Sequence, residues 1–153
     1  MRLRTYLVLV VVALLNGCGG GTKTATIEDL YSRQLRLPDG VKFRAEVATK
    51  PFEMARGLMF RDALPADRAM LFVYGQSGQY PVFTYQVRIP IDAIWLDQNR
   101  IINEIVPDIP PCNSTSARQC PQYGGTFRSL YVIEWNAGTA AKHKLKAGDR
   151  LDF

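Results

Sequence analysis

A carboxylate pair for acid–base chemistry would have to come from Asp92, Glu104, Asp108 and Glu134, and we consider Asp92 and Glu134 as an example. Asp92 follows Pro90-Ile91 at the start of an apolar run, and Glu134 lies in an alternating segment near the C-terminus. Glycoside-cleaving enzymes use such a pair of carboxylates, but the spacing here does not require that the two face one cleft. A hydrolase or lyase that uses acidic residues is therefore one hypothesis for the function, and it is the alternative to the binding role given below. Asp92 could instead stabilise a turn by accepting hydrogen bonds from backbone amides.

Two arginines, Arg56 and Arg61, flank the segment Gly57-Leu58-Met59-Phe60. An arginine can hold a carboxylate or a phosphate through two parallel hydrogen bonds. The structural alternative is an ion pair with a nearby acid such as Glu53 or Asp62. Taking the polar residues near predicted turns together, we predict a ligand-binding surface formed by Arg56, Arg61, Tyr85, Gln86, Asp92 and Asn136.

Other classes of catalytic site find little support. No serine lies in a Gly-x-Ser-x-Gly elbow, and the only histidine, His143, stands between two lysines. The sequence has no phosphate-binding loop and no dinucleotide fingerprint. We therefore predict no catalytic residues, no metal site and no cofactor. The favoured function is a non-catalytic module that binds a small molecule, a glycan or a protein partner.

The N-terminus is typical of an export signal. Arg2 and Arg4 precede the apolar run from Tyr6 to Leu15, which is too short for a bilayer span of ~20 residues. Leu15-Asn16-Gly17-Cys18 then resembles the lipobox of bacterial lipoproteins. That resemblance implies that residues 1–17 are cleaved and that lipid chains on Cys18 anchor the protein to a membrane, and two or more chains make such anchoring stable.

The remaining chain is expected to form a tether and one domain. Residues 18–36, in which Cys18 is followed by Gly19-Gly20-Gly21, are predicted to be a flexible linker. Residues 37–153 are the right length for a single domain. We expect the protein in the bacterial cell envelope, facing the periplasm or exterior. If the cell has an outer membrane, that membrane is favoured, because residue 19 is not the aspartate that retains lipoproteins in the inner membrane of enteric bacteria.

The charge pattern does not indicate a nucleic-acid partner. The formal net charge is +5 for the whole chain, and removal of Arg2 and Arg4 with the signal lowers it by two. The remaining basic residues are scattered rather than clustered. The expected partners are instead the membrane, through the lipid on Cys18, and an envelope protein or glycan.

Cys112 and Cys120 remain as an even pair once Cys18 is lipidated. In an oxidising compartment they are predicted to form a disulfide, which contributes ~2.5 kcal/mol for so short a loop. The alternatives are a redox pair, whose usual spacing is Cys-x-x-Cys, and a zinc site, which needs two further ligands.

The pattern of apolar residues predicts a mostly β fold, an antiparallel β-sandwich or small barrel with one or two short helices. No alternation of strands and helices calls for a parallel sheet. Short helices are expected between Thr49 and Gly57 and over 139–144. The expected strands cover residues 41–47, 69–74, 81–88, 91–96, 101–106, 130–135 and 150–153.

Six short motifs occur in an order that resembles the bacterial "domain of unknown function 192" family. They are Gly57-Leu58-Met59-Phe60-Arg61, Ala69-Met70-Leu71-Phe72-Val73-Tyr74, Pro90-Ile91-Asp92, Tyr131-Val132-Ile133-Glu134, Asn136-Ala137-Gly138 and Ala147-Gly148-Asp149. The resemblance covers about residues 40–153. It implies a compact β-rich domain, often exported, and no established activity. One departure is that the family's usual Lys-Asn pair before the Pro-aliphatic-Asp motif is replaced by Gln86-Val87.

Overall fold

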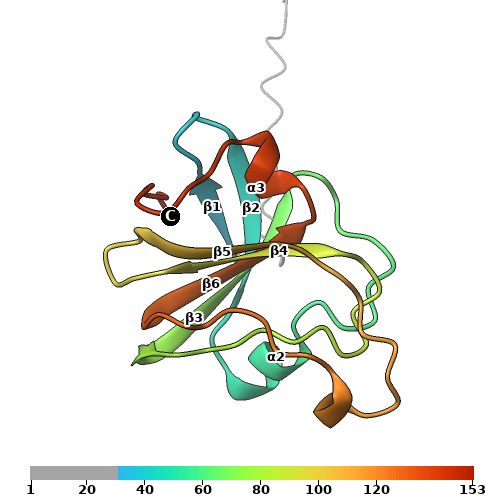
Figure 1. Cartoon of the computed structure of the whole chain (residues 1–153). Coiled ribbons are helices and arrows are strands. Elements are labelled where there is room, and N and C mark those ends of the chain that lie inside the picture. The colour runs from blue at the N-terminus through green and yellow to red at the C-terminus, as the bar shows by residue number, and fades with distance from the viewer. Residues whose placement is uncertain (1–30) are drawn as a thin grey trace, which may run out of the picture.

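A computed structural model of the chain describes residues 31–153. The predicted signal peptide (1–17), the lipidation site Cys18 and most of the predicted linker lie outside the described residues. The described part is built on one six-stranded sheet with the strand order β1-β2-β3-β6-β4-β5 (Figure 1). The strands are β1 Ser32–Arg36, β2 Lys42–Ala48, β3 Arg68–Gly78, β4 Ile91–Leu96, β5 Ile102–Ile109 and β6 Ser129–Asn136. The helices are α2 Pro51–Arg56, the 3-10 turn η1 Ala117–Gln119 and α3 Thr139–Lys142.

The sheet is mixed, with β2 and β3 as its one parallel pair among the described residues. Strands β2 and β3 are joined by a crossover that contains α2, because a parallel connection cannot be made by a tight turn. The predicted mostly β fold with short helices is confirmed. The expectation that no strands run parallel is wrong for this pair, and the sheet is not closed into a barrel.

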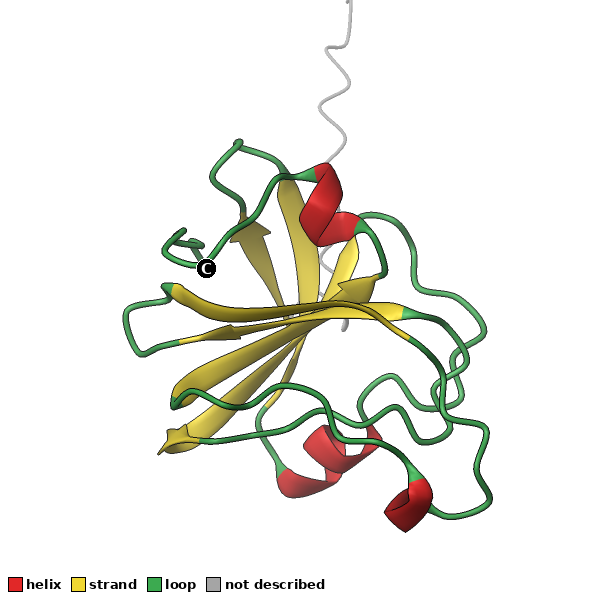
Figure 2. Ribbon diagram, viewed as in Figure 1, coloured by secondary structure: helices red, strands yellow, loops and turns green. Residues whose placement is uncertain are grey.

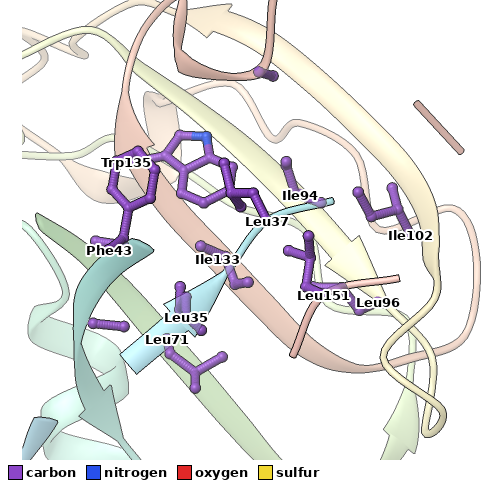
Figure 3. Packing of buried hydrophobic residues seen from close by; sticks show 13 residues of the cluster. Leu35, Leu37, Phe43, Leu71, Ile94, Leu96, Ile102, Ile133, Trp135 and Leu151 are labelled. Carbon is purple, nitrogen blue, oxygen red and sulfur yellow. The ribbon is translucent and has the colours of Figure 1, made fainter. Parts of the chain in front are cut away.

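Two cores pack on the two faces of the sheet, because side chains alternate between faces along each strand. On one face Trp135 and Phe43 pack with their ring centroids 5.4 Å apart, and Ile133, Leu71 and Leu35 surround them (Figure 3). Ala140 of α3 and Leu151 near the C-terminus belong to this core.

The opposite face carries the second core, which includes Phe72, Trp95 and Val132. Leu58, which follows α2, packs into this core. Helices α2 and α3 accordingly lie on opposite sides of the sheet, with long loops beside α2 (Figure 2). This second face positions the site described below.

Two segments expected as strands are not strands. Residues 81–88 make only isolated bridges, Val82 to Tyr123 and Tyr85 to Cys112. The extended run ends because the N–H of Val87 turns back to the carbonyl of Thr84 and Gln86 takes a left-handed φ of 57°. Residues 150–153 likewise make single bridges only, one of them between Asp152 and Arg36.

The described chain also enters the sheet earlier than the expected domain boundary. Strand β1 lies within residues 18–36, the predicted linker, and pairs with β2 from Ser32 to Arg36. Leu35 is fully buried in the core, so this end of the expected linker is part of the folded domain.

The loop between β5 and β6 contains the predicted disulfide. Cys112 and Cys120 are bonded, with their Cα atoms 5.8 Å apart. No helix within residues 31–153 is long and apolar enough to cross a bilayer.

Candidate functional site

A pocket of about 80 Å³ opens on the second face of the sheet, beside α2. We call it the Glu134 pocket, because Glu134 is the one acidic residue in its lining. It is lined by Met54, Ala55, Arg56, Gly57, Leu58, Met59, Phe72, Tyr74, Pro81, Val82, Phe83, Val87 and Glu134.

Glu134 lies in β6, directly opposite Met70 of β3 and Ala93 of β4. The register places its side chain on the same face as Val132, within the apolar core. Its exposed fraction is 6%, and no residue in 31–153 forms a hydrogen bond or ion pair with its carboxyl. Burial raises the pKa of Glu134 to about 8, so the group is mostly protonated near neutral pH.

Aromatic rings form much of the pocket wall. Phe72 and Tyr74 come from β3, and Phe83 comes from the loop after it. The Tyr74 ring stacks on Tyr80 at 3.5 Å between centroids. Burial, with smaller effects of Glu134 and Tyr80, raises the pKa of Tyr74 to about 12, so its hydroxyl keeps its proton.

Arg56 is the last residue of α2 and stands at the rim of the pocket. Its side chain is exposed, and it has no ion pair within residues 31–153. The predicted pairing of this arginine with Glu53 or Asp62 is absent there. Glu53 instead contacts Lys50 at 3.4 Å, and Asp62 contacts Arg88 at 2.6 Å.

A wider groove of about 730 Å³ adjoins the pocket and shares Arg56, Gly57 and Met59 with it. Phe52 and Phe60, which are 74% and 54% exposed, line this groove. The pocket and the groove therefore share part of their wall at the C-terminal end of α2, and we call the two together the cleft.

Local hydrogen bonds hold α2 in place along the cleft. Pro51 begins the helix, where its missing N–H costs nothing. The carboxylate of Glu53 accepts hydrogen bonds from the N–H groups of Thr49 and Lys50 at 3.2 and 3.1 Å. Gly57 ends the helix with a positive φ of 44°.

Arg61, the second predicted arginine, lies in the groove but is already paired. Its two terminal nitrogens donate to the two oxygens of Glu46, each at 2.7 Å. The Arg61 guanidinium lowers the pKa of Glu46 below its usual value. This pair stabilises the groove wall and leaves Arg61 less available than Arg56 to a ligand.

Asp92 is fully buried and its oxygens are occupied by the backbone. Oδ1 accepts hydrogen bonds from the N–H groups of Asp108 and Gly138, at 2.9 and 3.0 Å. Oδ2 accepts one from the N–H of Ala140 at 2.8 Å. Asp92 therefore has the structural role considered above and holds the start of α3 against the sheet.

The other predicted site residues lie outside the Glu134 pocket. The Asn136 amide donates to the carbonyl of Leu64 at 2.8 Å. It does not cap α3, whose N-cap is Gly138. Tyr85 lies against the disulfide loop, with its hydroxyl 3.5 Å from the carbonyl of Thr115. The carbonyl of Gln86 accepts a hydrogen bond from the N–H of Phe60, which connects the segment after α2 to residues 81–88.

The two carboxylates considered for acid–base chemistry cannot act together. Asp92 pairs with Trp135 and Ala93 pairs with Glu134 across β4 and β6. Neighbouring residues of a strand point to opposite faces, so the sheet separates Asp92 from Glu134. The structure therefore removes the mechanism that uses this pair. Among residues 31–153, no three or more His, Cys, Asp and Glu side chains gather as metal ligands would.

The family to which this chain belongs is shown by a match to a family model. The model of DUF192, described as "Uncharacterized ACR", matches residues 35–153. The chain belongs to the DUF192 family. The family resemblance noted in the sequence is thus confirmed, and the description assigns no activity to its members.

Two solved structures are similar to this DUF192 protein. One is a protein of unknown function from Novosphingobium aromaticivorans, with 27% identity and a TM-score of 0.68 over 80% of this chain and 84% of that one. The other is described as a candidate transcription regulator from Sinorhizobium meliloti, with 27% identity and a TM-score of 0.63 over 78% and 89%. A comparison with curated proteins found no match.

Sequence reasoning found Arg56 but missed the pocket around Glu134. The signal was present in the segment that became β6, where Glu134 alternates in step with Val132. An acid on the apolar side of a strand pattern indicates a buried carboxyl. The aromatic wall could not be predicted, because Phe72 and Phe83 meet only after the chain folds.

Proposed function

We propose that this DUF192 protein is an exported bacterial lipoprotein whose domain binds a small molecule in the Glu134 pocket. The observation that carries the binding role is the Glu134 side chain, which is only 6% exposed, lines the pocket and has no hydrogen-bond partner among residues 31–153. A buried polar group without a partner destabilises the fold. A ligand that supplies a hydrogen-bond donor or a counter-charge would offset that cost.

A small molecule is favoured over a glycan or a protein because of where the polar groups lie. Glu134 lines the pocket as a buried residue, whereas Arg56 lines it as an exposed one and so stands at its rim. Small-molecule sites are typically apolar cavities with a few placed polar groups. A larger partner would contact the wide groove and leave the buried carboxyl without a partner.

The location follows from the N-terminal sequence. A cleaved signal over residues 1–17 and lipid chains on Cys18 would hold the domain at a membrane surface of the cell envelope, facing the periplasm or exterior, with the outer membrane favoured. The disulfide between Cys112 and Cys120 supports this proposal, because disulfides persist in oxidising compartments and are rare in the cytosol.

Expression of the full chain in a bacterium tests the anchoring. We expect the wild-type protein in the membrane fraction, with mass spectrometry showing a processed N-terminus that begins at acylated Cys18. The Cys18→Ala variant should carry no acyl mass, and the processed, membrane-anchored form should not be recovered from it. Recovery of the intact wild-type chain from the cytosol would contradict the proposal.

A thermal-shift screen of small amphipathic compounds tests the binding role. Ala55 lines the pocket on an exposed surface of α2, so Ala55→Trp should fill it from the rim. Ala63 is an exposed alanine outside the cleft and gives the matched control Ala63→Trp. We expect compounds that raise the Tm of wild type and Ala63→Trp but not of Ala55→Trp. A screen without any such compound would count against a binding pocket.

A further inference from the structure

The chemistry of the Glu134 pocket is more specific than a general apolar site. Three aromatic side chains, Phe72, Tyr74 and Phe83, share it with one buried carboxyl. One arginine, Arg56, stands at the rim. The pocket thus holds an ionisable acid among aromatic residues and a cation at its mouth.

We infer that the pocket takes a small zwitterion, whose methylated or otherwise apolar ammonium group enters to face Glu134 and whose anionic group binds Arg56. This inference rests on the proposed binding function and names the ligand class for it. Free zwitterions and the headgroups of zwitterionic phospholipids share this chemistry.

The inner half of the pocket favours an ammonium group. The ionised Glu134 carboxylate would be buried without a counter-charge among residues 31–153, and a cation bound beside it would supply one. Aromatic rings attract cations through their negative faces and are the usual walls of sites for methylated ammonium groups. Phe72, Tyr74 and Phe83 line the same space, and one face of the Tyr74 ring is covered by Tyr80.

The outer half favours an anion. Arg56 is exposed and has no ion pair within residues 31–153, and an arginine forms paired hydrogen bonds with carboxylate or phosphate. A ligand with a positive charge alone would be repelled by this arginine on its way in. A ligand with both charges can place its anionic group at Arg56, at the rim, and its ammonium group at Glu134, further in.

The size of the pocket agrees with a small head group. A space of about 80 Å³ exceeds the roughly 10–15 Å³ that one water requires on the same kind of measure. The adjoining groove of about 730 Å³ leaves room for the remainder of a larger molecule, such as a lipid, outside the pocket.

Titration calorimetry with three matched probes tests the inference on the mature chain carrying Cys18→Ser, so that no lipid is attached. Glycine betaine carries both charges, tetramethylammonium carries only the cation, and 3,3-dimethylbutyrate replaces the ammonium by a neutral carbon of the same shape. We expect glycine betaine to bind more tightly than tetramethylammonium, and 3,3-dimethylbutyrate to bind at least tenfold more weakly than glycine betaine. Equal binding of glycine betaine and 3,3-dimethylbutyrate, or no binding of any probe, would overturn the inference.

Two variants that each remove one charge show which group binds which part of the ligand. Glu134→Gln should weaken glycine betaine and tetramethylammonium at least tenfold each. Arg56→Gln should weaken glycine betaine several-fold without weakening tetramethylammonium. Arg118 in η1 lies outside the cleft, and Arg118→Gln should leave both affinities unchanged. Wild-type affinity for glycine betaine in Glu134→Gln would refute the role of the carboxylate.

The pH dependence gives a second readout. The other ionisable groups that line the pocket are Tyr74 from β3 and Arg56 from α2, and the strand neighbours Met70 and Ala93 do not titrate. Because an ammonium group pairs with the ionised acid, affinity for glycine betaine should rise from about pH 6 to about pH 9 with release of a proton. The profile should be flat in Glu134→Gln. Affinity that falls as the pH rises would show a neutral Glu134 as the binding form and refute the inference.

Vesicles separate the two sources of the same chemistry. We compare binding of the unlipidated chain to vesicles of phosphatidylglycerol with and without phosphatidylcholine. Binding that requires both phosphatidylcholine and Glu134 identifies a headgroup ligand, and Glu134-dependent binding of soluble glycine betaine alone identifies a free zwitterion. If the thermal-shift screen instead yields neutral ligands that Ala55→Trp blocks and Glu134→Gln does not, the binding function stands and the zwitterion inference fails.

Discussion

The Oδ2 atom of Asp92 accepts a hydrogen bond from the backbone N–H of Ala140 at 2.8 Å, which connects strand β4 to the first turn of α3. Its Oδ1 atom also accepts from Gly138 and Asp108. One buried side chain thus satisfies three N–H groups that would otherwise lack partners in the protein.

Asp92→Ala is therefore expected to destabilise the domain by about 3 kcal/mol, because each buried N–H left without a partner has a cost. Urea unfolding followed by tryptophan fluorescence measures the change. Asp67, an exposed loop residue, gives the control Asp67→Ala, whose free energy of unfolding should stay within about 0.5 kcal/mol of wild type. Equal stability of Asp92→Ala and Asp67→Ala would show that these hydrogen bonds contribute little.

The raised pKa of Glu134 predicts that the free energy of unfolding falls as the pH rises. Its pKa is raised from 4.5 to about 8, so between these values the folded state keeps a proton that the unfolded state has lost. Stability should decrease from about pH 4.5 to about pH 8 and level off above, by at most ~5 kcal/mol. In Glu134→Gln this contribution is absent, so the variant should be more stable than wild type near pH 8.5. Parallel slopes for the two proteins between these pH values would contradict the raised pKa.

Gly124 packs against Trp95, and a Cβ atom there would lie 2.4 Å from the tryptophan ring. Because Gly124 also has a φ of +56°, Gly124→Ala combines backbone strain with a clash and should cost roughly 3 kcal/mol. Gly148 also has a positive φ but has no atoms within 4 Å of the added Cβ. Gly148→Ala should therefore cost only about 1 kcal/mol, and thermal unfolding compares the two. A larger loss for Gly148→Ala would contradict the packing argument.

The ion pair of Glu46 and Arg61 is expected to stabilise the folded domain modestly, and this stabilisation should be lost in acid. Arg61 lowers the pKa of Glu46, so the contribution is complete above the unfolded value of 4.5 and disappears as the pH falls through the lower folded pKa. Both side chains are partly exposed, which limits the coupling to about 1 kcal/mol. A double-mutant cycle with Glu46→Gln and Arg61→Gln, measured at neutral and acid pH, should give this coupling only at neutral pH. A coupling that survives in acid would exclude an ionic origin.

The sequence predicted the elements that depend on local pattern. The alternating segments and the apolar run became β2, β6 and β3, and Pro51 and Gly57 correctly marked the ends of α2. The parallel pairing of β2 with β3 could not be predicted, because no local signal says on which side a short crossover helix returns. The segment 81–88 has β-forming side chains, yet the turn at Gln86 and tertiary contacts prevent a strand.

The candidate site was only partly predictable for a similar reason. Arg56 could be identified because an arginine beside a glycine at a helix end is visible in the sequence. The sequence suggests Glu134 as one member of a carboxylate pair, and its separation from Asp92 by the sheet depends on the register of β4 against β6. A shift of one residue would have placed both on one face, and only the folded structure distinguishes the two registers.

The position of β6 has a consequence for how the chain acquires its structure. This strand is inserted between β3 and β4, which precede it by more than thirty residues. A chain that emerges with its N-terminus first therefore exposes the open edges of β3 and β4 until Asn136 has arrived. The native sheet is completed only when nearly the whole polypeptide is available, so folding follows synthesis rather than accompanying it.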